Sequence, residues 1–485
     1  MQTQKKMAAV SKTRFVIKTI NKISPAGLAR FGGDKYTITP SEENPEIAHA
    51  IMLRSHKMQD SDVPLTTRAI ARYVDARPCP KSPEKKFRNA RASKRKDDDA
   101  VRTSRCGAGT NNCNVPRMTE LGVPVFNTPG ANANAVKELV LCGLFMASRG
   151  VYEGAAHMKQ LHEEGTAHER IEKDKALFGG RELEGKTLGV VGLGAIGAAV
   201  AHSAIALGMD VVGYDPALSV EGALRLPGSD MAMADLEELC SKADYVSLHA
   251  PYIKDVTHHL LSAELIGKLK PDASILNFAR GELVDEAALA ARYDAGGGGR
   301  YICDFAVGPE LWPRPNVVSI PHLGASTEEA EENAASMAAD TIQLFLETGT
   351  IRDSVNFPSC ALPPRMESVN RVCVVTENKP GMLGELMSVF GEGGLNILQQ
   401  VNMSRGDIAY NVIDLEIVRK DDGSIDTTNF GDFDKLQETI LSIEGVKSTR
   451  FINDWCPGSG FAIKYQDRII GIGVDAPEQK SYAEM

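Results

Sequence analysis

The segment that most constrains this chain is a glycine-rich turn placed between a buried strand and a helix. Residues 187–191 (TLGVV) have the continuous apolar pattern of a strand buried on both faces, and residues 192–197 (GLGAIG) follow directly and open a helix expected to end near Gly208. In a G-x-G-x-x-G turn the first glycine permits the tight turn, the second lets the backbone approach a diphosphate, and the third lets helix and strand pack closely. The segment predicts a doubly wound α/β sheet with a dinucleotide site at Gly192, Gly194, Ala195, Ile196 and Gly197.

The next predicted strand supports this assignment. Residues 210–214 (DVVGY) end at Asp215, which lies 18 residues after Gly197. A carboxylate at this point accepts hydrogen bonds from the ribose hydroxyls of an adenosine and repels a 2′-phosphate. We therefore expect the cofactor to be NAD rather than NADP. The alternative is that the small residues serve only to pack the helix against the strand.

Length, charge and cysteine content limit the class of protein. A chain of 485 residues with 43% hydrophobic and 24% charged residues predicts about three globular domains. Residues 188–209 carry no formal charge and are long enough for a membrane span, but five glycines, His202 and Ser203 favour a strand, turn and helix. The net charge of −10 argues against a nucleic-acid or membrane-surface partner. Nine cysteines without a C-x-x-C pair indicate reduced thiols and no metal site, as in a cytoplasmic protein.

A basic stretch interrupts the first part of the chain. Residues 77–105 contain eleven Lys or Arg against four acidic residues, a local charge of +7. Such a composition cannot bury enough apolar surface to order itself, so we expect residues 73–105 to form a disordered insert. A basic patch for phosphates is the alternative, although Phe87 is the only aromatic residue among these charges. Whether the insert is a natural loop or an error in the gene model stays open.

Two further features follow predicted strands and have the chemistry of a reacting centre. Arg280 comes after the strand expected at 272–278, and His322 comes after the strand expected at 317–320. Ligands of open α/β sheets bind at the carboxyl ends of the strands. An Arg there can grip a carboxylate and polarise the neighbouring carbonyl, and a His can exchange the hydroxyl proton while NAD takes the hydride. Together they predict a 2-hydroxy acid dehydrogenase. The alternatives are a surface Arg280 paired with Asp285 and a His322 bonded only to backbone groups.

Four segments resemble the D-isomer-specific 2-hydroxyacid dehydrogenases, namely VVGLGAIG (190–197), LNFARGELVDEAAL (276–289), PHLGASTEEAEENAA (321–335) and NTPGANANAVKELV (127–140). The resemblance implies a Rossmann NAD-binding domain at 112–323 and a flavodoxin-like substrate domain built from 12–111 and 324–356. It also implies that Arg280 holds the substrate carboxylate and carbonyl, that His322 is the general acid/base, and that Asp304 lies near the nicotinamide. The implied reaction is oxidation of 3-phospho-D-glycerate to 3-phosphohydroxypyruvate, the first step of serine synthesis, in a homodimer or homotetramer.

One family feature is displaced, and the substrate residues follow from the resemblance. In the family a Glu-Pro follows the Asp, and the carboxylate of that Glu pairs with the His. Here Pro309 precedes Glu310, so we do not assign Glu310 as the partner of His322.

The resemblance places an Arg-Ser segment over the substrate phosphate and a glycine-rich turn at the substrate carboxylate. The alternative for the Arg-Ser segment is a solvated strand end. The expected substrate contacts are Arg54, Ser55, Lys57, Ala108, Gly109 and Asn111.

A third domain follows a proline-rich linker at 357–368. Residues 371–397 (RVCVVTENKPGMLGELMSVFGEGGLNI) resemble the start of an ACT domain, an α+β module of βαββαβ order that we assign to 369–455. The resemblance places Asn378 and Asn396 at positions that contact serine, but Thr376 stands where some serine-inhibited members have a His. Effector binding and simple dimerisation therefore both remain open. The tail at 456–485 has no assigned structure.

Two other functions compete with the implied one. The first is a different D-2-hydroxyacid dehydrogenase that acts on hydroxypyruvate, glyoxylate or D-lactate. The second is a non-catalytic NAD-binding sensor, against which the presence of both Arg280 and His322 argues.

Overall fold

A computed structural model describes residues 15–33, 35–40, 48–54, 56–58, 62–64, 67–72, 112–366, 369–416, 433–452, 461–465 and 468–472. These residues divide into two compact units: the first contains residues up to 129 and from 331 onward, and the second contains residues 130–330. The basic insert expected at 73–105 lies outside the described residues.

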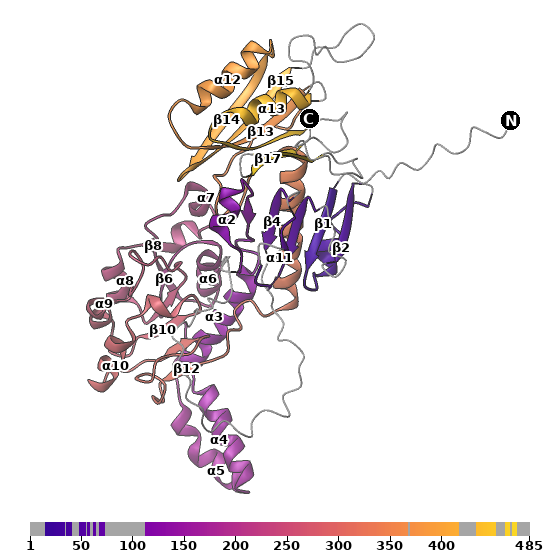
Figure 1. The fold of residues 1–485 in the computed structure, drawn as a ribbon. Coiled ribbons are helices and arrows are strands. Elements are labelled where there is room, and N and C mark those ends of the chain that lie inside the picture. Colours follow the sequence, from indigo (N-terminus) through magenta and orange to yellow (C-terminus); the bar gives the residue numbers. More distant parts are fainter. Residues whose placement is uncertain are drawn as a thin grey trace, which may run out of the picture. The chain divides into compact units, whose positions relative to one another are not determined.

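The first unit begins with a parallel sheet whose strands lie in the order β2-β1-β3-β4-β5 (Figure 1). This is the order of a flavodoxin-like sheet, as predicted. Strand β3 is buried along its whole length, as its continuous apolar run AIML predicts for a strand covered on both faces. The elements are β1 (Phe15–Ile20), α1 (Pro25–Leu28), β2 (Tyr36–Pro40), β3 (Ala50–Leu53), β4 (Ala69–Arg72), α2 (Val115–Glu120), β5 (Val125–Phe126) and α11 (Glu328–Thr348).

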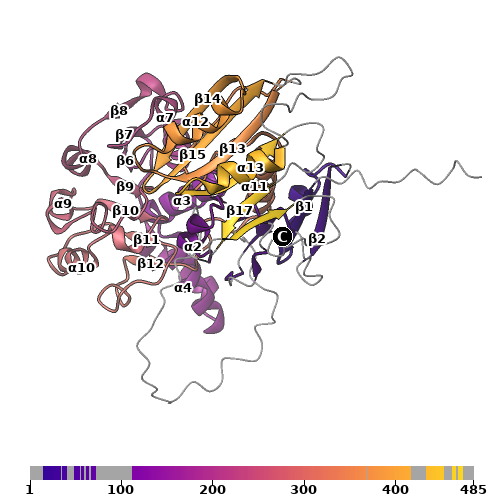
Figure 2. The ribbon, with the colours of Figure 1, turned by 45° about the horizontal axis from the view of Figure 1, so that its top comes forward.

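The first unit also contains an antiparallel sheet with the strand order β14-β15-β13-β16-β17-β18. Helices α12 and α13 lie over one face of this sheet and share a buried apolar core with it (Figure 2). The predicted βαββαβ order is present, and β17 and β18 extend the sheet into the tail that had no assigned structure. The elements are β13 (Val369–Glu377), α12 (Met382–Glu392), β14 (Ile397–Arg405), β15 (Ile408–Glu416), α13 (Phe433–Ser442), β16 (Val446–Ile452), β17 (Phe461–Tyr465) and β18 (Arg468–Ile472).

The second unit is built on a parallel sheet with the order β12-β11-β10-β9-β6-β7-β8. Numbered from β6, its first six strands have the 3-2-1-4-5-6 order of a dinucleotide-binding fold, which confirms the doubly wound prediction. Apolar cores lie on both faces of the sheet. The strands are β6 (Thr187–Val191), β7 (Asp210–Tyr214), β8 (Met231–Met233), β9 (Tyr245–Leu248), β10 (Ser274–Asn277), β11 (Tyr301–Cys303) and β12 (Val317–Ser319). The helices are α3 (Ala133–Ser148), α4 (Val151–Glu163), α5 (Ala167–Asp174), α6 (Ala195–Ala206), α7 (Val220–Ala223), α8 (Leu236–Lys242), α9 (Ala263–Lys268) and α10 (Glu286–Asp294).

Three details refine the expectations drawn from the sequence. The uncharged run 188–209 forms β6 and α6, and no helix of the described residues is long and apolar enough to cross a membrane. The second unit begins at Gly130 rather than at 112, because β5 pairs with β4 in the first sheet. The sequence analysis did not predict α4 and α5, which extend from the second unit as a helical pair (Figure 1).

Candidate active site

The candidate active site lies at the carboxyl edge of the seven-stranded sheet. Because the strands are parallel, the residues that follow them meet at one edge. In the spatial order β7, β6, β9, β10, β11 and β12, the strands are followed by Asp215, the glycine turn, His249, Arg280, Asp304 and His322. Neighbouring strands are about 4.8 Å apart, so the four steps from β7 to β11 span about 19 Å. The residues at this edge therefore form a row long enough for an extended dinucleotide.

The glycine turn has the geometry that a diphosphate site requires. Gly192 has φ +93°, and a side chain there would place its Cβ 2.8 Å from the backbone nitrogen of Ala250. A Cβ on Gly197 would collide with the carbonyl oxygen of Gly192, so α6 packs tightly on the turn. A Cβ on Gly194 would have no atom within 4 Å, which leaves open space above the backbone. These three observations fit the three expected roles and leave room for a diphosphate at the start of α6.

The carboxylate of Asp215 is fixed beside this turn. Its Oδ2 accepts a hydrogen bond from the backbone N–H of Leu193 at 2.8 Å, and its Oδ1 accepts one from the N–H of Ala217 at 2.9 Å. Each carboxylate oxygen has a second lone pair for a ribose hydroxyl. Asp215 is thus held in the place where a ribose would lie next to the glycine turn.

A tight turn after β10 presents Arg280. The backbone N–H of Arg280 donates to Asn277 Oδ1 at 3.2 Å, and its carbonyl oxygen accepts from Asn277 Nδ2 at 2.8 Å. The guanidinium Nη1 donates to the carbonyl oxygen of Ala279 at 2.7 Å. Asp285, the partner considered for a surface arginine, caps α10 by accepting from the N–H of Ala288 at 3.0 Å and forms an ion pair with His259.

Asp304 and His322 lie at the ends of the next two strands. The side chain of Asp304 is fully buried, and its Oδ2 accepts a hydrogen bond from the backbone N–H of Gly324 at 3.0 Å. Its Oδ1 has no hydrogen-bond donor within the described part of the chain. Burial raises the pKa of the Asp304 carboxyl, and the positive charge of nearby His322 acts in the opposite direction. A buried carboxylate oxygen without a donor is what a site completed by a bound cofactor leaves in the protein alone.

His249 is a site residue that the sequence analysis missed. It follows β9 directly, and its backbone carbonyl carbon would lie 2.8 Å from a Cβ on Gly192. Its Nε2 forms a hydrogen bond with the hydroxyl of Ser247 at 2.8 Å, and its removal from water lowers its pKa to about 4. The signal was present in the sequence, since a His-Ala-Pro directly follows the apolar run YVSL of β9 at the same edge.

The expected substrate residues that the structure describes belong to the first unit. Arg54 follows β3, and its Nη1 forms an ion pair with Glu331 Oε1 at 3.2 Å and donates to the carbonyl oxygen of Lys22 at 3.1 Å. The side chains of Arg54 and Glu331 are only 13% and 3% exposed. Lys57 is exposed. The other expected contacts lie outside the described residues, namely Ser55, Ala108, Gly109 and Asn111.

Glu310, which was not assigned as the partner of His322, is exposed at the surface. Its backbone carbonyl accepts a hydrogen bond from Arg314 Nε at 2.8 Å. The carboxylate that interacts electrostatically with His322 is instead that of Asp304. Asp304 accepts a hydrogen bond from the backbone N–H of Gly324, which lies two residues after His322. No cluster of metal-ligating side chains occurs in the described residues.

The two expected effector residues do not meet within one chain. Asn378 Nδ2 donates to the carbonyl oxygen of Gly406 at 3.0 Å, directly after β14, whereas Asn396 directly precedes β14 and donates to Glu416 Oε2 at 2.7 Å. Nine residues of β14 separate these two ends, which corresponds to about 30 Å. A single small amino acid therefore cannot contact both side chains of one copy.

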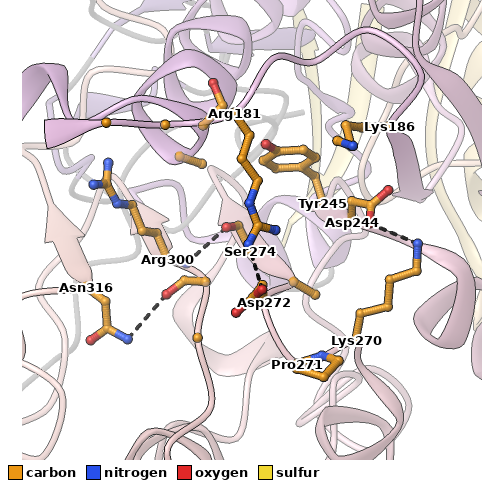
Figure 3. A pocket seen from close by; sticks show the side chains of 17 residues that line it. Arg181, Lys186, Asp244, Tyr245, Lys270, Pro271, Asp272, Ser274, Arg300 and Asn316 are labelled. Atoms are coloured by element: carbon orange, nitrogen blue, oxygen red, sulfur yellow. Dashed lines mark hydrogen bonds and ion pairs between the residues drawn. The ribbon is translucent and has the colours of Figure 1, made fainter. Parts of the chain in front are cut away.

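A cavity of about 560 Å³ lies at the opposite, amino-terminal edge of the seven-stranded sheet. Figure 3 shows its charged lining, in which Arg181 pairs with Asp272 at 2.7 Å and Lys270 pairs with Asp244 at 2.9 Å. These cations are neutralised by carboxylates of the same cavity. The cavity also lies across the sheet from the glycine turn, so it is distinct from the candidate active site.

The chain is similar in sequence and in fold to known proteins. Residues 144–324 match the family model described as D-isomer specific 2-hydroxyacid dehydrogenase, NAD binding domain. A D-3-phosphoglycerate dehydrogenase of Haemophilus influenzae is 36% identical over 318 residues, covering 64% of this chain and 73% of the relative. The enzyme of that name from Dictyostelium discoideum is 33% identical over 319 residues, covering 64% and 74%. The solved structure of Rhodotorula graminis D-mandelate dehydrogenase superposes with a TM-score of 0.55 at 21% identity, covering 72% of this chain and 99% of that one, which shows the shared fold.

Proposed function

The chain belongs to the D-isomer-specific 2-hydroxyacid dehydrogenases, and from that premise we propose that it oxidises 3-phospho-D-glycerate to 3-phosphohydroxypyruvate with NAD, the first step of serine synthesis. The single observation that carries the proposal is the row of residues at the carboxyl edge of the sheet. This row runs from Asp215 through the glycine turn to Arg280, Asp304 and His322. The row combines a cofactor site with an arginine that can bind an anionic substrate and a histidine that can accept a proton.

Each of these residues has a defined task in the reaction. The glycine turn and Asp215 would hold NAD, which would supply the acceptor for the hydride of the substrate carbon that carries the hydroxyl. Arg280 binds the substrate carboxylate and polarises the oxygen that becomes a carbonyl. His322 removes the hydroxyl proton during oxidation and returns it during reduction. Asp304 supplies the negative charge that favours the protonated form of His322.

The phosphate of the substrate is assigned to cations of the first unit. Arg54 lies at the end of β3, and its largely buried guanidinium is fixed by Glu331 and by the carbonyl oxygen of Lys22. An Arg offers five N–H donors in a rigid fork, so an arginine held in this way retains the geometry needed to grip a phosphate. Lys57 supplies a second charge from the same strand end.

The ion pair of Arg54 also favours a second candidate. The buried Glu331 carboxylate already compensates the charge of Arg54. If Glu331 neutralises the charge of Arg54 completely, no positive charge of Arg54 is left for a phosphate. Such a site suits an unphosphorylated 2-hydroxy acid, such as the reduction product of hydroxypyruvate or glyoxylate. The two functions differ in one measurable respect, because only the first makes Arg54 essential for a substrate that carries a phosphate.

A homodimer is part of the proposal. The helical pair α4 and α5, with the turn after it, exposes large apolar side chains: Val151 is 62%, Tyr152 55%, Ile171 47% and Leu177 72% exposed. Exposed apolar side chains concentrated on one extension mark a protein interface. We propose that a second copy of the chain covers this surface. We also propose that the protein works in the cytoplasm, where its thiols stay reduced.

The βαββαβ domain is proposed to bind an amino acid such as serine only between two copies. Asn378 and Asn396 lie at opposite ends of β14. An antiparallel pairing of two such domains would bring Asn378 of one copy toward Asn396 of the other. The effector site therefore depends on the dimer.

The reverse reaction gives the simplest test of the function. Purified protein is assayed for NADH oxidation with 3-phosphohydroxypyruvate, and His322→Ala is compared with the unmodified chain. Loss of a general acid/base lowers the rate by about 100-fold or more. An unchanged rate in His322→Ala would remove His322 from the mechanism.

A further inference from the structure

A fully buried asparagine lies at the end of β10, directly beneath the turn that carries Arg280. The side chain of Asn277 is 0% exposed and makes four hydrogen bonds. Its Oδ1 accepts from the backbone N–H groups of Ala279 and Arg280, both at 3.2 Å. Its Nδ2 donates to the carbonyl oxygen of Arg280 at 2.8 Å and to the hydroxyl of Tyr301 at 3.3 Å. We propose that Asn277, braced by Tyr301, is the positioning residue that fixes Arg280 for the reaction.

The hydrogen-bond inventory of the carboxamide is used completely. An Asn side chain has two N–H donors and two acceptor lone pairs, and all four are engaged here. One carboxamide thus holds both the N–H and the carbonyl of Arg280, so neither peptide plane that flanks the arginine can rotate without breaking a buried hydrogen bond. The guanidinium is therefore presented from a backbone that the fold has immobilised.

Tyr301 connects this turn to the neighbouring strand. Its side chain is fully buried in β11, three residues before Asp304, so the bond from Asn277 crosses from β10 to β11. The turn also passes close to the strand's end, because a Cβ added to Gly281 would lie only 3.2 Å from the ring of Phe305, the residue after Asp304. The carboxamide of Asn277 therefore sets the position of Arg280 relative to the strand that bears the buried acid.

The inference rests on the proposed function, because it assigns Arg280 to substrate binding. Misplacing a substrate-binding group by about 1 Å costs roughly 100-fold in rate, so a residue that acts only on this backbone still affects catalysis. The cofactor turn follows a different strand, β6, whereas the four hydrogen bonds of Asn277 go to Ala279, Arg280 and Tyr301. The substitution should therefore affect turnover and leave NADH binding unchanged.

The test is a double-mutant cycle between Asn277 and Arg280. Asn277→Asp keeps the shape and the two acceptor bonds but places an oxygen against the carbonyl of Arg280. We measure kcat, KM and the dissociation constant of NADH for Asn277→Asp, Arg280→Lys and the double variant. Asn316→Asp is the matched control, because Asn316 donates to the carbonyl oxygen of Gly299 at the opposite edge of the same sheet.

The expected loss of kcat/KM in Asn277→Asp is about 10- to 100-fold, with the dissociation constant of NADH changed by less than about twofold. In the Arg280→Lys background the same substitution should cost less than about threefold, because the two residues act as one unit. Tyr301→Phe, which removes one of the four bonds, should show a smaller loss in the same direction. Equal losses in both backgrounds, or a parallel loss of NADH affinity, would overturn the proposal.

The cycle is run with whichever 2-oxo acid the unmodified chain reduces, chosen from 3-phosphohydroxypyruvate, hydroxypyruvate and glyoxylate. Arg280 binds the carboxylate that all three share, so the cycle does not depend on the phosphate. If the chain reduces only the unphosphorylated acids, the proposed substrate is wrong. The double-mutant cycle would still show whether Asn277 and Arg280 are coupled.

Discussion

The buried carboxylate of Asp304 accepts a hydrogen bond from the backbone N–H of Gly324 at 3.0 Å, which ties the end of β11 to the segment that carries His322. The acid and the imidazole come from different strands and are brought together by the parallel order of the sheet. The positive charge of His322 acts against the effect of burial on the Asp304 carboxyl. We propose that this electrostatic interaction takes the role of the family's Glu-Pro carboxylate, which is displaced in this sequence.

Asp304→Asn should shift the pH dependence of the reverse reaction. The amide oxygen of Asn can still accept from Gly324, but the negative charge beside His322 is lost. Reduction needs the protonated imidazole, which then requires a lower pH. The upper break of the profile of kcat/KM should move to lower pH by about one unit. The measurement is the initial rate of NADH oxidation at a series of pH values. A break that stays at the same pH would show that a group other than Asp304 stabilises the protonated form of His322.

Arg54→Ala should separate the two candidate substrates. If Arg54 binds the substrate phosphate, its loss raises the KM for 3-phosphohydroxypyruvate by about 10-fold or more and leaves the KM for hydroxypyruvate nearly unchanged. Arg30→Ala is the matched control, because Arg30 pairs with Asp340 on the exposed surface of the same unit. Equal effects of Arg54→Ala on both substrates would argue that Arg54 has no contact with the phosphate.

Asp215→Asn should weaken the preference for NADH over NADPH. The Asp215 carboxylate accepts from the N–H groups of Leu193 and Ala217, one at each oxygen, so an amide nitrogen at either position loses a bond as well as the charge. We expect the ratio of kcat/KM for NADH to that for NADPH to fall by about 10-fold. A ratio that stays constant would place the ribose elsewhere.

The stability of the chain should depend on pH through His49. This side chain is buried, its Nδ1 accepts from the N–H of Val16 at 2.8 Å, and burial together with the charge of Arg68 lowers its pKa to about 2. Below about pH 6.5 this histidine takes up a proton in the unfolded chain but not in the folded chain. The free energy of unfolding therefore decreases by about 1.4 kcal/mol for each unit by which the pH is lowered below about 6.5. In His49→Asn, whose oxygen can replace Nδ1, that slope should disappear between pH 6.5 and 4.5.

Urea unfolding midpoints followed by circular dichroism measure this slope. The comparison uses the difference between the two proteins at each pH, because other groups titrate equally in both. Identical slopes for the unmodified chain and His49→Asn would mean that His49 takes up its proton in the folded state.

The cofactor half of the site was predictable from the sequence because its signals are local. A buried strand, the three glycines and Asp215 follow one another within 30 residues, and each glycine has the steric role that its spacing indicates. Arg280 and His322 were also predictable, since each follows a strand that the apolar pattern marks.

The remaining features depend on contacts between distant segments. The bond from Gly324 to Asp304 and the bond from Asn277 to Tyr301 each join two different strand ends, which no local pattern encodes. The other three bonds of Asn277 lie within its own turn. The separation of Asn378 and Asn396 follows from the full length of β14, whereas the sequence only shows that they are 18 positions apart. Helices α4 and α5 bury little apolar surface within the described chain, Leu161 and Ala167 being their buried residues, so the pattern of a core-facing helix is weak in their sequence.

The central claim is that the row of residues at the carboxyl edge of the sheet reduces a phosphorylated 2-oxo acid with NADH. The most direct measurement is the kcat/KM of the unmodified chain for 3-phosphohydroxypyruvate and for hydroxypyruvate, each with NADH. We predict a value for the phosphorylated acid that is at least about 100-fold higher, as expected when Arg54 and Lys57 contact a phosphate. Equal values, or a preference for hydroxypyruvate, would contradict the account.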